Sequence, residues 1–462
     1  MKVYNTLSRQ IEEFKEIKEG HVKLYCCGPT VYNYAHIGNL RTFIFEDVLK
    51  RTLTNYGYKV KHVMNITDVG HLTGDGDDGD DKMKKRSQET GRSVYEIADF
   101  YTKAFFADEE ALNIIRPDIV CKATDHIQDM IDIVKLLEEK GHTYMAGGNV
   151  YFSIDTIDDY GKLARLNLED LKEGARIQVD LNKKNPKDFV LWFTNSKFKD
   201  QAMIWPSPWG IGYPGWHLEC SAMSYAFLGK EFDMHCGGID AISVHHTNEI
   251  AQSEAAFGIK PWVKYWLHGE FLLNDTGKMS KSSGEFLTLP VVVKNGYDAL
   301  DYRYFCLSGH YRSQLKFSYE ALGHAKSARK SLNERVLQLK ESQACALSEK
   351  AKEYQTLFFE AFYNDLKAPL ALSYLWQMLK DNTLADGEKL ALVLEMDEIL
   401  GLDLAKLENN EEHSDELLNY VNLRAEAKKN KDFASADKYR DLISNLGYTV
   451  KDTPQGPVLE KK

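Results

Sequence analysis

Four residues of this sequence have side chains that could together bind a transition metal, namely Cys27, Cys220, His245 and Glu249. His245 and Glu249 lie four positions apart in a segment with a helical pattern, so their side chains share one helix face. Two thiolates, an imidazole and a carboxylate together suit Zn²⁺. Scattered cysteines and histidines more often serve packing, and spacing alone does not separate the two interpretations. Cys26 adds an ambiguity, because strand alternation lets only one of two adjacent cysteines face a crevice.

A second group of residues has the chemistry to bind a nucleotide. The segment from Cys27 to Asn39, which includes His36 and Gly38, follows an apolar strand and precedes a helix with one apolar face. A strand, a turn of small residues and a helix together present backbone N–H groups to a phosphate. Alone, this pattern is weak evidence for a nucleotide site.

Two polar segments further along the chain extend this chemistry. Lys278-Met-Ser-Lys281-Ser282 brings two lysines and two hydroxyls together in one short run, which could equally be a solvated loop. In Gly237-Gly238-Ile239-Asp240, the glycines permit close approach of the backbone, and Asp240 could accept hydrogen bonds from a ribose.

Taken together, the segments at 36–39 and 278–282 resemble the two signature motifs of the class I aminoacyl-tRNA synthetases, called HIGH and KMSKS. Cys27, nine residues before His36, and the segments Gly215-Trp-His-Leu-Glu-Cys220 and His245-His-Thr-Asn-Glu249 are similar to those of the cysteinyl-tRNA synthetases. The resemblance implies one zinc ion held by Cys27, Cys220, His245 and Glu249. Zinc prefers a thiolate to a hydroxyl, whereas a simple pocket separates near-isosteres such as cysteine and serine only by about 10–200-fold.

The resemblance also implies roles for the remaining residues and a reaction in two steps. Cysteine and Mg²⁺-ATP give cysteinyl-adenylate and pyrophosphate, and the cysteinyl group then passes to the terminal adenosine of tRNA(Cys). The implied catalytic residues are His36, Asn39, Lys278 and Lys281, with Gly38, Gly238, Asp240 and Lys281 binding the nucleotide and Gly28, Thr67 and Trp216 the amino acid. Asn39 departs from the histidine more often found there, although asparagine also donates a hydrogen bond. Trp216 fits a plain core position equally well.

The strands and helices expected around these residues alternate along the chain. This alternation predicts an α/β fold with a doubly wound, Rossmann-like parallel sheet. Strands are expected at 21–26, 59–66, 189–193 and 231–236, and helices at 126–140 and 241–257, the last ended by Gly258. From about residue 299 the chain is almost all helical, with long amphipathic segments at 315–340 and 351–379 and a charged linker at 408–416. The final segment is expected to hold a helix pair and a short strand.

We therefore expect six regions. They are a first catalytic half at 1–120, an insertion domain at 121–190, a second catalytic half with the zinc site at 191–258, a region with the KMSKS loop at 259–310, a tRNA-binding helical bundle at 311–407 and an anticodon-binding domain at 417–462. From Val421 onward, nine Lys and Arg stand against six Asp and Glu in a chain whose net charge is −11. From charge alone, a solvated helical hairpin would explain this last segment.

Composition sets further limits. The seven cysteines are irregularly spaced and predict a reducing compartment, not a disulfide framework. No signal-peptide core and no membrane span is evident, so we expect a cytoplasmic monomer. The acidic run at 74–81 fails the EF-hand test, because Arg86 falls where a bidentate glutamate is needed. Two alternatives stay open: a ligase that joins cysteine to an aminosugar, and a non-catalytic paralogue that binds tRNA.

Overall fold

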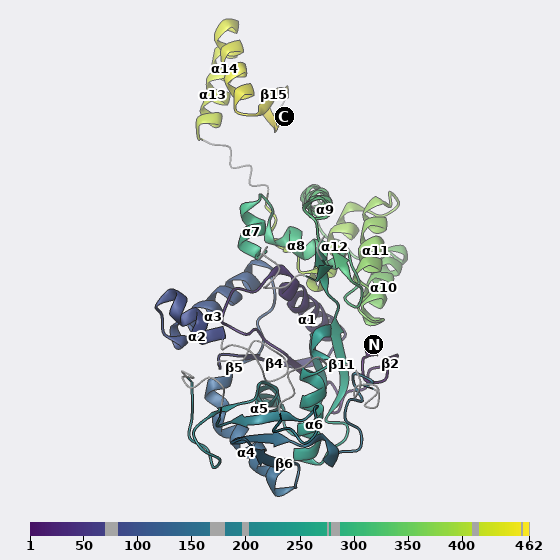
Figure 1. Cartoon of the computed structure of the whole chain (residues 1–462). Helices are drawn as coiled ribbons and strands as arrows, with labels where there is room; N and C mark the ends of the chain where they lie inside the picture. Colours follow the sequence, from purple (N-terminus) through teal and green to yellow (C-terminus); the bar gives the residue numbers. More distant parts are fainter. Residues whose placement is uncertain are drawn as a thin grey trace. The chain divides into compact units, whose positions relative to one another are not determined.

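The computed structural model describes residues 1–69, 82–166, 181–195, 203–274, 277–278, 287–408, 415–453 and 456–461. Two units, Met1–Lys406 and Leu407–Lys462, each fold on their own contacts (Figure 1). Among the described helices, none combines the length and apolar character needed to cross a bilayer.

The centre of the first unit is a five-stranded sheet in which every neighbouring pair is parallel. Its strand order is β11-β10-β3-β4-β5. The bounds are β3 His21–Cys26, β4 Lys59–Ile66, β5 Ile119–Lys122, β10 Phe232–Gly238 and β11 Val263–Gly269. The order reverses between β3 and β10, and such a switch point opens a crevice at the carboxyl ends of the strands. The expected doubly wound fold is thus confirmed.

Helices cover both faces of this sheet, so that all but one residue of β10 and all but one of β11 are buried. On one face, α4 (Ile127–Glu139), α5 (Trp216–Leu228) and α6 (His245–Phe257) pack on one another, and their apolar residues join those of the strands in one core. On the other face, α1 (Ile37–Asn55) packs against β10 and β11, with α2 (Lys82–Thr90) and α3 (Val94–Ala111) alongside (Figure 1). Gly258 ends α6 in the left-handed conformation, as expected.

The insertion forms a separate antiparallel sheet, and here one expectation was wrong. Phe189–Phe193 does not return to the parallel sheet, because this strand, β8, pairs with β7 (Asn149–Phe152) and β9 (Tyr213–Pro214), and β7 also pairs with β6 (Thr143–Ala146). All five residues of β8 are buried. The antiparallel sheet therefore continues past residue 190, and the last parallel strand, β11, lies beyond residue 258.

The second half of the first unit is helical, with small sheets at its edges. Its helices are α7 (Leu289–Lys294), α8 (Ala299–Leu307), α9 (Tyr319–Leu339), α10 (Glu349–Tyr363), α11 (Ala368–Lys380) and α12 (Asp386–Leu400). Strand β1 (Lys2–Asn5) pairs with β2 (Gln10–Glu13), and β12 (Leu272–Asn274) lies between β13 (Gly277–Lys278) and β14 (Leu315–Lys316). Short 3₁₀ turns occur at Ala123–His126, Ile154–Thr156, Ile239–Ala241 and Leu404–Lys406.

The segment 351–379, expected as one amphipathic stretch, breaks into α10 and α11. The chain reverses at Asp365 and Leu366, which both have positive φ angles. The buried carboxylate of Asp365 accepts hydrogen bonds from the backbone N–H of Tyr4 at 2.9 Å and from the Tyr311 hydroxyl at 2.8 Å. These contacts, made by residues distant in sequence, hold a backbone conformation that disfavours most side chains.

The second unit contains the expected helix pair, α13 (Asp415–Lys429) and α14 (Phe433–Asn445), and a hairpin of β15 (Tyr448–Thr453) and β16 (Gly456–Lys461). Leu417, Val421 and Ile443 form its small core. The Arg424 guanidinium makes two hydrogen bonds to the Asp452 carboxylate, at 2.9 and 3.0 Å, and Lys428 contacts the same group. Part of the positive charge of this segment is therefore paired within the unit. Residues 409–414 of the expected linker lie outside the described residues.

Glu109 on α3 gives the first unit a predicted pH dependence. Its side chain is buried, and in the described part of the chain neither carboxylate oxygen has a hydrogen-bond partner. Burial, together with the nearby Asp47, raises the pKa of Glu109 from 4.5 to about 8. The folded protein thus binds this proton more tightly than the unfolded chain does. The resulting stability is fully present below pH 4.5 and is lost as the pH rises to about 8.

We expect Glu109→Gln, which cannot ionise, to unfold at a temperature roughly 2–4 °C higher than the wild type at pH 8.5. Thermal denaturation followed by circular dichroism at pH 6 and pH 8.5 measures this difference. Glu110→Gln, at the exposed neighbouring position, is the control and should melt like the wild type. Equal pH dependence in both variants would show that Glu109 is ionised in the folded protein at neutral pH.

Candidate functional site

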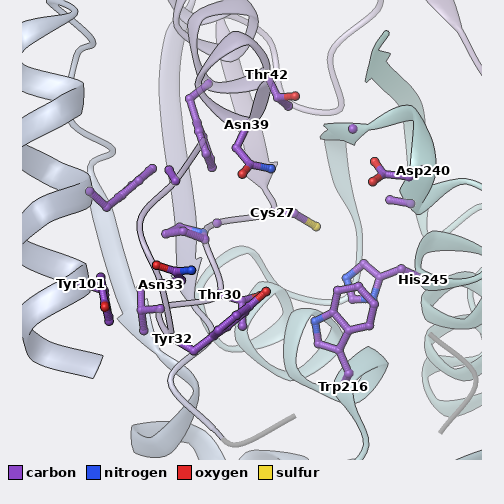
Figure 2. A pocket seen from close by; sticks show the side chains of 18 of the residues that line it. Cys27, Thr30, Tyr32, Asn33, Asn39, Thr42, Tyr101, Trp216, Asp240 and His245 are labelled. Atoms are coloured by element: carbon purple, nitrogen blue, oxygen red, sulfur yellow. The ribbon is translucent and has the colours of Figure 1, made fainter. Parts of the chain in front are cut away.

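A cavity of about 290 Å³ opens at the carboxyl edge of the parallel sheet, beside the switch point between β3 and β10. Figure 2 shows its labelled side chains, with Tyr101 on one side and Trp216, His245 and Asp240 on the other. Seven residues singled out from the sequence line it, namely Cys27, Gly28, Asn39, Trp216, Gly238, Asp240 and His245. They come from four separate segments of the chain, so the fold and not sequence proximity brings them together.

The chain leaves β3 along the wall of the cavity, which explains the need for glycine at position 28. A Cβ atom on Gly28 would lie 1.6 Å from the backbone oxygen of Asn65. The Asn65 side-chain oxygen accepts a hydrogen bond from the Gly28 N–H at 2.8 Å. This contact directs Cys27 into the cavity, whereas Cys26 is buried and hydrogen-bonds with Cys236. Of the two adjacent cysteines, Cys27 is the one that lines the cavity.

The four expected metal-binding residues do meet in space. Their donor atoms, from Cys27, Cys220, His245 and Glu249, all lie within 4.8 Å of one another. The two sulfur atoms are 3.9 Å apart, and Cys220 Sγ lies 3.5 Å from His245 Nε2. A tetrahedral zinc site has S···S and S···N edges of about 3.8 and 3.6 Å.

Glu249 supplies a second indication that this group fits a cation. Its Oε1 is buried and lies 2.9 Å from His245 Nε2, at ion-pair distance. Two buried ligand atoms, one from a carboxylate and one from an imidazole, that face the same point are what a shared metal ion requires. The residues present therefore fit Zn²⁺.

The electrostatics of the group favour the metal-binding protonation state of two of its members, Cys220 and Glu249. Burial alone would raise the pKa of the Cys220 thiol, but the hydrogen bond from Cys27 and the nearby His245 lower it to about 7. Burial likewise opposes ionisation of Glu249, but His245 and His235 lower its pKa to about 2. A thiolate and a carboxylate are thus available near neutral pH, as metal binding requires. In contrast, the hydrogen bond to Cys220 together with burial raises the pKa of the Cys27 thiol, and Glu249 and Cys220 raise the pKa of His245 to about 10 against the effect of burial.

Sequence reasoning missed four buried histidines around this group. His235 Nε2 lies 2.9 Å from Glu249 Oε2 and orients that carboxylate, while His217 Nδ1 lies 2.9 Å from His245 Nδ1. Trp216 stacks on His245 with ring centroids 4.1 Å apart. Partners of this kind fix the orientation of metal ligands.

His246 and His268 are the other two buried histidines, and His246 belongs to a second possible set of metal ligands. His246 Nε2 lies 3.2 Å from Cys27 Sγ, and its Nδ1 lies 2.8 Å from His268 Nε2. Cys27, His235, His246 and Glu249 also bring four donor atoms within 4.8 Å. His246 stands in the His-His-Thr-Asn-Glu segment, and this motif was the sequence signal that could have identified it. His235 and His268 lie in buried strands whose sequence pattern is that of a hydrophobic core.

The turn from His36 to Asn39 starts α1 with two reciprocal hydrogen bonds. The Asn39 N–H donates to His36 Nδ1 at 3.0 Å, and the His36 N–H donates to Asn39 Oδ1 at 3.3 Å. Because Nδ1 accepts, the neutral ring carries its proton on Nε2, and because Oδ1 accepts, the asparagine presents its NH₂ group as a donor. The turn thus caps the helix, and Asn39 lines the cavity whereas His36 is not among the lining residues.

Contacts from distant segments hold the residue between His36 and Gly38. The Ile37 N–H donates to the backbone oxygen of Leu287 at 2.9 Å, and the Tyr302 hydroxyl donates to the Ile37 oxygen at 2.6 Å. Gly38 lies against Leu272 of β12, whose Cβ would be 3.7 Å from a Cβ at position 38. Segments on both sides of residues 279–286 are therefore fixed to the start of α1.

Three further residues were expected in the site from the sequence, namely Lys278, Lys281 and Thr67. The backbone of Lys278 belongs to β13, and Lys281 lies outside the described residues. Thr67 does not line the cavity, and its hydroxyl donates to Glu219 Oε2 at 3.0 Å. Its backbone pairs with Thr30, which does line the cavity.

Comparison with known proteins decides the family. The family model "tRNA synthetases class I (C) catalytic domain" matches residues 13–327. The chain is 52% identical to the cysteine–tRNA ligase of Treponema denticola over 98% of both chains, and 45% identical to that of Borreliella burgdorferi over 100% of this chain and 99% of the relative. The chain belongs to the cysteine–tRNA ligase family. The family expected from the sequence motifs is confirmed.

Solved structures support the fold alone. A methionyl-tRNA synthetase of Mycobacterium tuberculosis in complex with methionyl-adenylate superposes with a TM-score of 0.56 at 15% identity, covering 83% of this chain and 90% of that one. A second structure of that enzyme, bound by methionyl-adenylate, gives a TM-score of 0.55 at 15% identity, over 90% of this chain and 96% of the other. The class I synthetase architecture is therefore retained where little sequence similarity remains.

Proposed function

We propose that this chain activates L-cysteine with ATP and transfers it to tRNA(Cys), and that both steps take place at the cavity beside β3 and β10. One observation carries the proposal: Cys27 and His245, two members of the metal-donor group, line the same cavity as Asn39 of the turn that starts α1. The metal-donor group fits a thiol substrate and the turn a nucleotide. Family membership supports the same reaction.

The donor set fits one zinc ion held by Cys27, Cys220, His245 and Glu249. When bound there, zinc would supply a Lewis acid that binds a substrate thiolate in preference to a hydroxyl. His235 and His217 keep the Glu249 and His245 side chains oriented through their hydrogen bonds. Gly28, Thr67 and Trp216 are the proposed contacts to the rest of the cysteine, with Thr67 acting through its backbone pairing to Thr30.

The nucleotide is proposed to bind between the start of α1 and the turn after β10. Gly38 and Gly238 permit close approach of the backbone, Asp240 accepts from the ribose, and His36 and Asn39 donate to the phosphates. With Mg²⁺, Lys278 and Lys281 neutralise the charge that develops as pyrophosphate leaves.

The chemistry needs no protein nucleophile. A carboxylate oxygen of cysteine attacks the α-phosphate of ATP, and the bond to pyrophosphate breaks. In the second step a hydroxyl of the terminal ribose, for this class the 2′-hydroxyl, attacks the adenylate carbonyl and AMP leaves. Positioning and electrostatic stabilisation therefore supply the rate acceleration.

Regions beyond the cavity are proposed to bind the rest of the tRNA. The helices α9 to α12 would contact its body, and the unit 407–462 would bind the anticodon with the basic residues that are not paired to Asp452. We propose a monomer that acts in the cytoplasm.

The test is ATP-dependent transfer of labelled cysteine to tRNA(Cys), with serine as the competing substrate. The proposal expects transfer of cysteine and not of serine, together with cysteine-dependent pyrophosphate exchange. Pyrophosphate release without transfer to tRNA would indicate a ligase acting on a small molecule, and no turnover would indicate a binding protein. Either result would overturn the proposal.

The hydrogen bond of Tyr302 leads to a prediction about how the His36–Asn39 turn is held in place. Tyr302→Phe removes only the hydroxyl that donates to the Ile37 oxygen. Because this contact positions the start of α1, we expect the KM for ATP in pyrophosphate exchange to rise about 5–10-fold while the KM for cysteine stays unchanged. Tyr304→Phe is the control, since its hydroxyl bonds to Trp376 among the helices. Equal rises in both KM values would argue for a general loss of structure instead.

A further inference from the structure

Three aromatic rings form a continuous surface from the interior of the cavity to the outside of the first unit. Tyr34 and Tyr101 line the cavity, whereas Phe100 does not and is 40% exposed. The ring centroids of Tyr34 and Tyr101 are 5.0 Å apart, those of Phe100 and Tyr101 are 5.1 Å apart, and those of Tyr34 and Phe100 are 6.1 Å apart. All three pairs meet edge to face. We call Tyr34, Phe100 and Tyr101 the aromatic wall.

Positively charged side chains lie against the aromatic wall. The Arg92 guanidinium lies over the Phe100 ring, 5.0 Å from its centroid. Arg86 donates to the Tyr101 hydroxyl from Nε at 3.0 Å and from Nη2 at 2.8 Å. The sequence of α2, which packs against α3, contains three more lysines at positions 82, 84 and 85. In a chain with a net charge of −11, this segment is distinctly basic.

We propose that the aromatic wall is the stacking surface for the single-stranded 3′ end of the tRNA as it enters the cavity. The inference rests on the proposed function and adds to it the path by which the 3′ end of the tRNA reaches the cavity. The terminal nucleotide must reach the adenylate inside the cavity, so the nucleotides before it must cross the rim. Exposed aromatic rings beside arginines bind single-stranded nucleic acid by stacking on bases and by pairing with phosphates.

The wall matches this partner better than it matches the small substrates. Phe100 lies outside the cavity lining and against Tyr101. Tyr101 lies across the cavity from Trp216 and His245, where the thiol of cysteine is proposed to bind (Figure 2). Cysteine and ATP therefore have no need of Phe100, whereas a polynucleotide that extends out of the cavity does. Arg86 and Arg92, which contact the aromatic wall, complement the charge of its backbone.

The deciding experiment compares the two half-reactions in Phe100→Ala. We expect cysteine-dependent pyrophosphate exchange to proceed as in the wild type, while the KM for tRNA in cysteine transfer rises about tenfold. Phe100→Trp, which keeps a stacking surface, should retain the wild-type KM for tRNA. Tyr95→Ala is the matched control, because Tyr95 lies on the same helix, is 58% exposed and is not part of the wall.

Phe100→Leu, which keeps apolar volume without a ring, separates stacking from simple burial. The proposal expects it to behave like Phe100→Ala. A wild-type KM for tRNA in Phe100→Ala, or in Phe100→Leu, would overturn the proposal while leaving the proposed function intact. Absence of pyrophosphate exchange in the wild type would instead overturn the proposed function itself, so the two failures are distinguishable.

Discussion

Cys220→Ser should lose bound zinc and cysteine activation together. Cys220 is 1% exposed, its sulfur lies 3.9 Å from that of Cys27, and His245 and Cys27 lower its pKa to about 7, so it is the thiol of the group best suited to act as a thiolate. A serine hydroxyl stays protonated at neutral pH and is a poor ligand for zinc. We expect elemental analysis to find at most about a tenth of the full zinc content, and cysteine-dependent pyrophosphate exchange to be at least about 100-fold slower.

The control for this variant is Cys306→Ser. Cys306 is also buried, but it lies on α8 among the helices and takes no part in the metal-donor group. It should retain full zinc and activity. Full zinc content in Cys220→Ser would remove Cys220 from the ligand set and would favour the arrangement with His235 and His246. Retained activity without zinc would contradict selection of the substrate through its thiolate.

The strand and helix at the start of the proposed nucleotide site could be predicted from the sequence because their determinants are local. An apolar strand, a turn with glycines and a helix with one apolar face specify β3 and α1 within 35 residues, His21 to Asn55. The capping box between His36 and Asn39 is equally local. It also explains why asparagine suffices at position 39, since its Oδ1 caps the helix while its NH₂ group is presented as a donor.

The metal-donor group needed both local and distant information. The four-residue spacing of His245 and Glu249 places them on one helix face, but nothing local brings Cys27 and Cys220 to them. Only the resemblance of the sequence motifs to the family indicated that these four side chains would lie together. His235 could not be found in this way, because it lies in a buried strand whose pattern is that of core, and its partner Glu249 is reached only through the tertiary fold.

The two differences in secondary structure have separate physical causes. The apolar run Phe189–Phe193 is buried on both faces, which is compatible with a parallel or an antiparallel sheet, so periodicity could not name its partners. The break between α10 and α11 had a local signal that was missed. Pro369 stands in the first turn of α11, and a proline within a helical pattern ends the preceding helix. Asp365 and its contacts to Tyr4 and Tyr311 then fix the geometry of that break.

Lys281→Ala is the second variant from which a large effect is expected. Lys281 itself lies outside the described residues, but the structure fixes the chain on both sides of residues 279–286. On one side β13 pairs with β12, whose Leu272 lies against Gly38, and on the other the Leu287 oxygen accepts from the Ile37 N–H. These anchors keep the lysine-containing segment attached to the turn that is proposed to hold the phosphates of ATP.

Loss of this lysine should slow the first step far more than it weakens substrate binding. The negative charge on the phosphates increases as pyrophosphate leaves, so a lysine at that position acts mainly in the transition state. We expect adenylate formation in a single turnover to be slowed by about 10²–10³-fold, with the KM for cysteine unchanged. Lys294→Ala, on α7, is the control for removal of a positive charge near the same segment. A proportional loss of rate and of cysteine affinity in Lys281→Ala would assign the residue a structural role, and an unchanged rate would leave Lys278 as the lysine that neutralises the departing pyrophosphate.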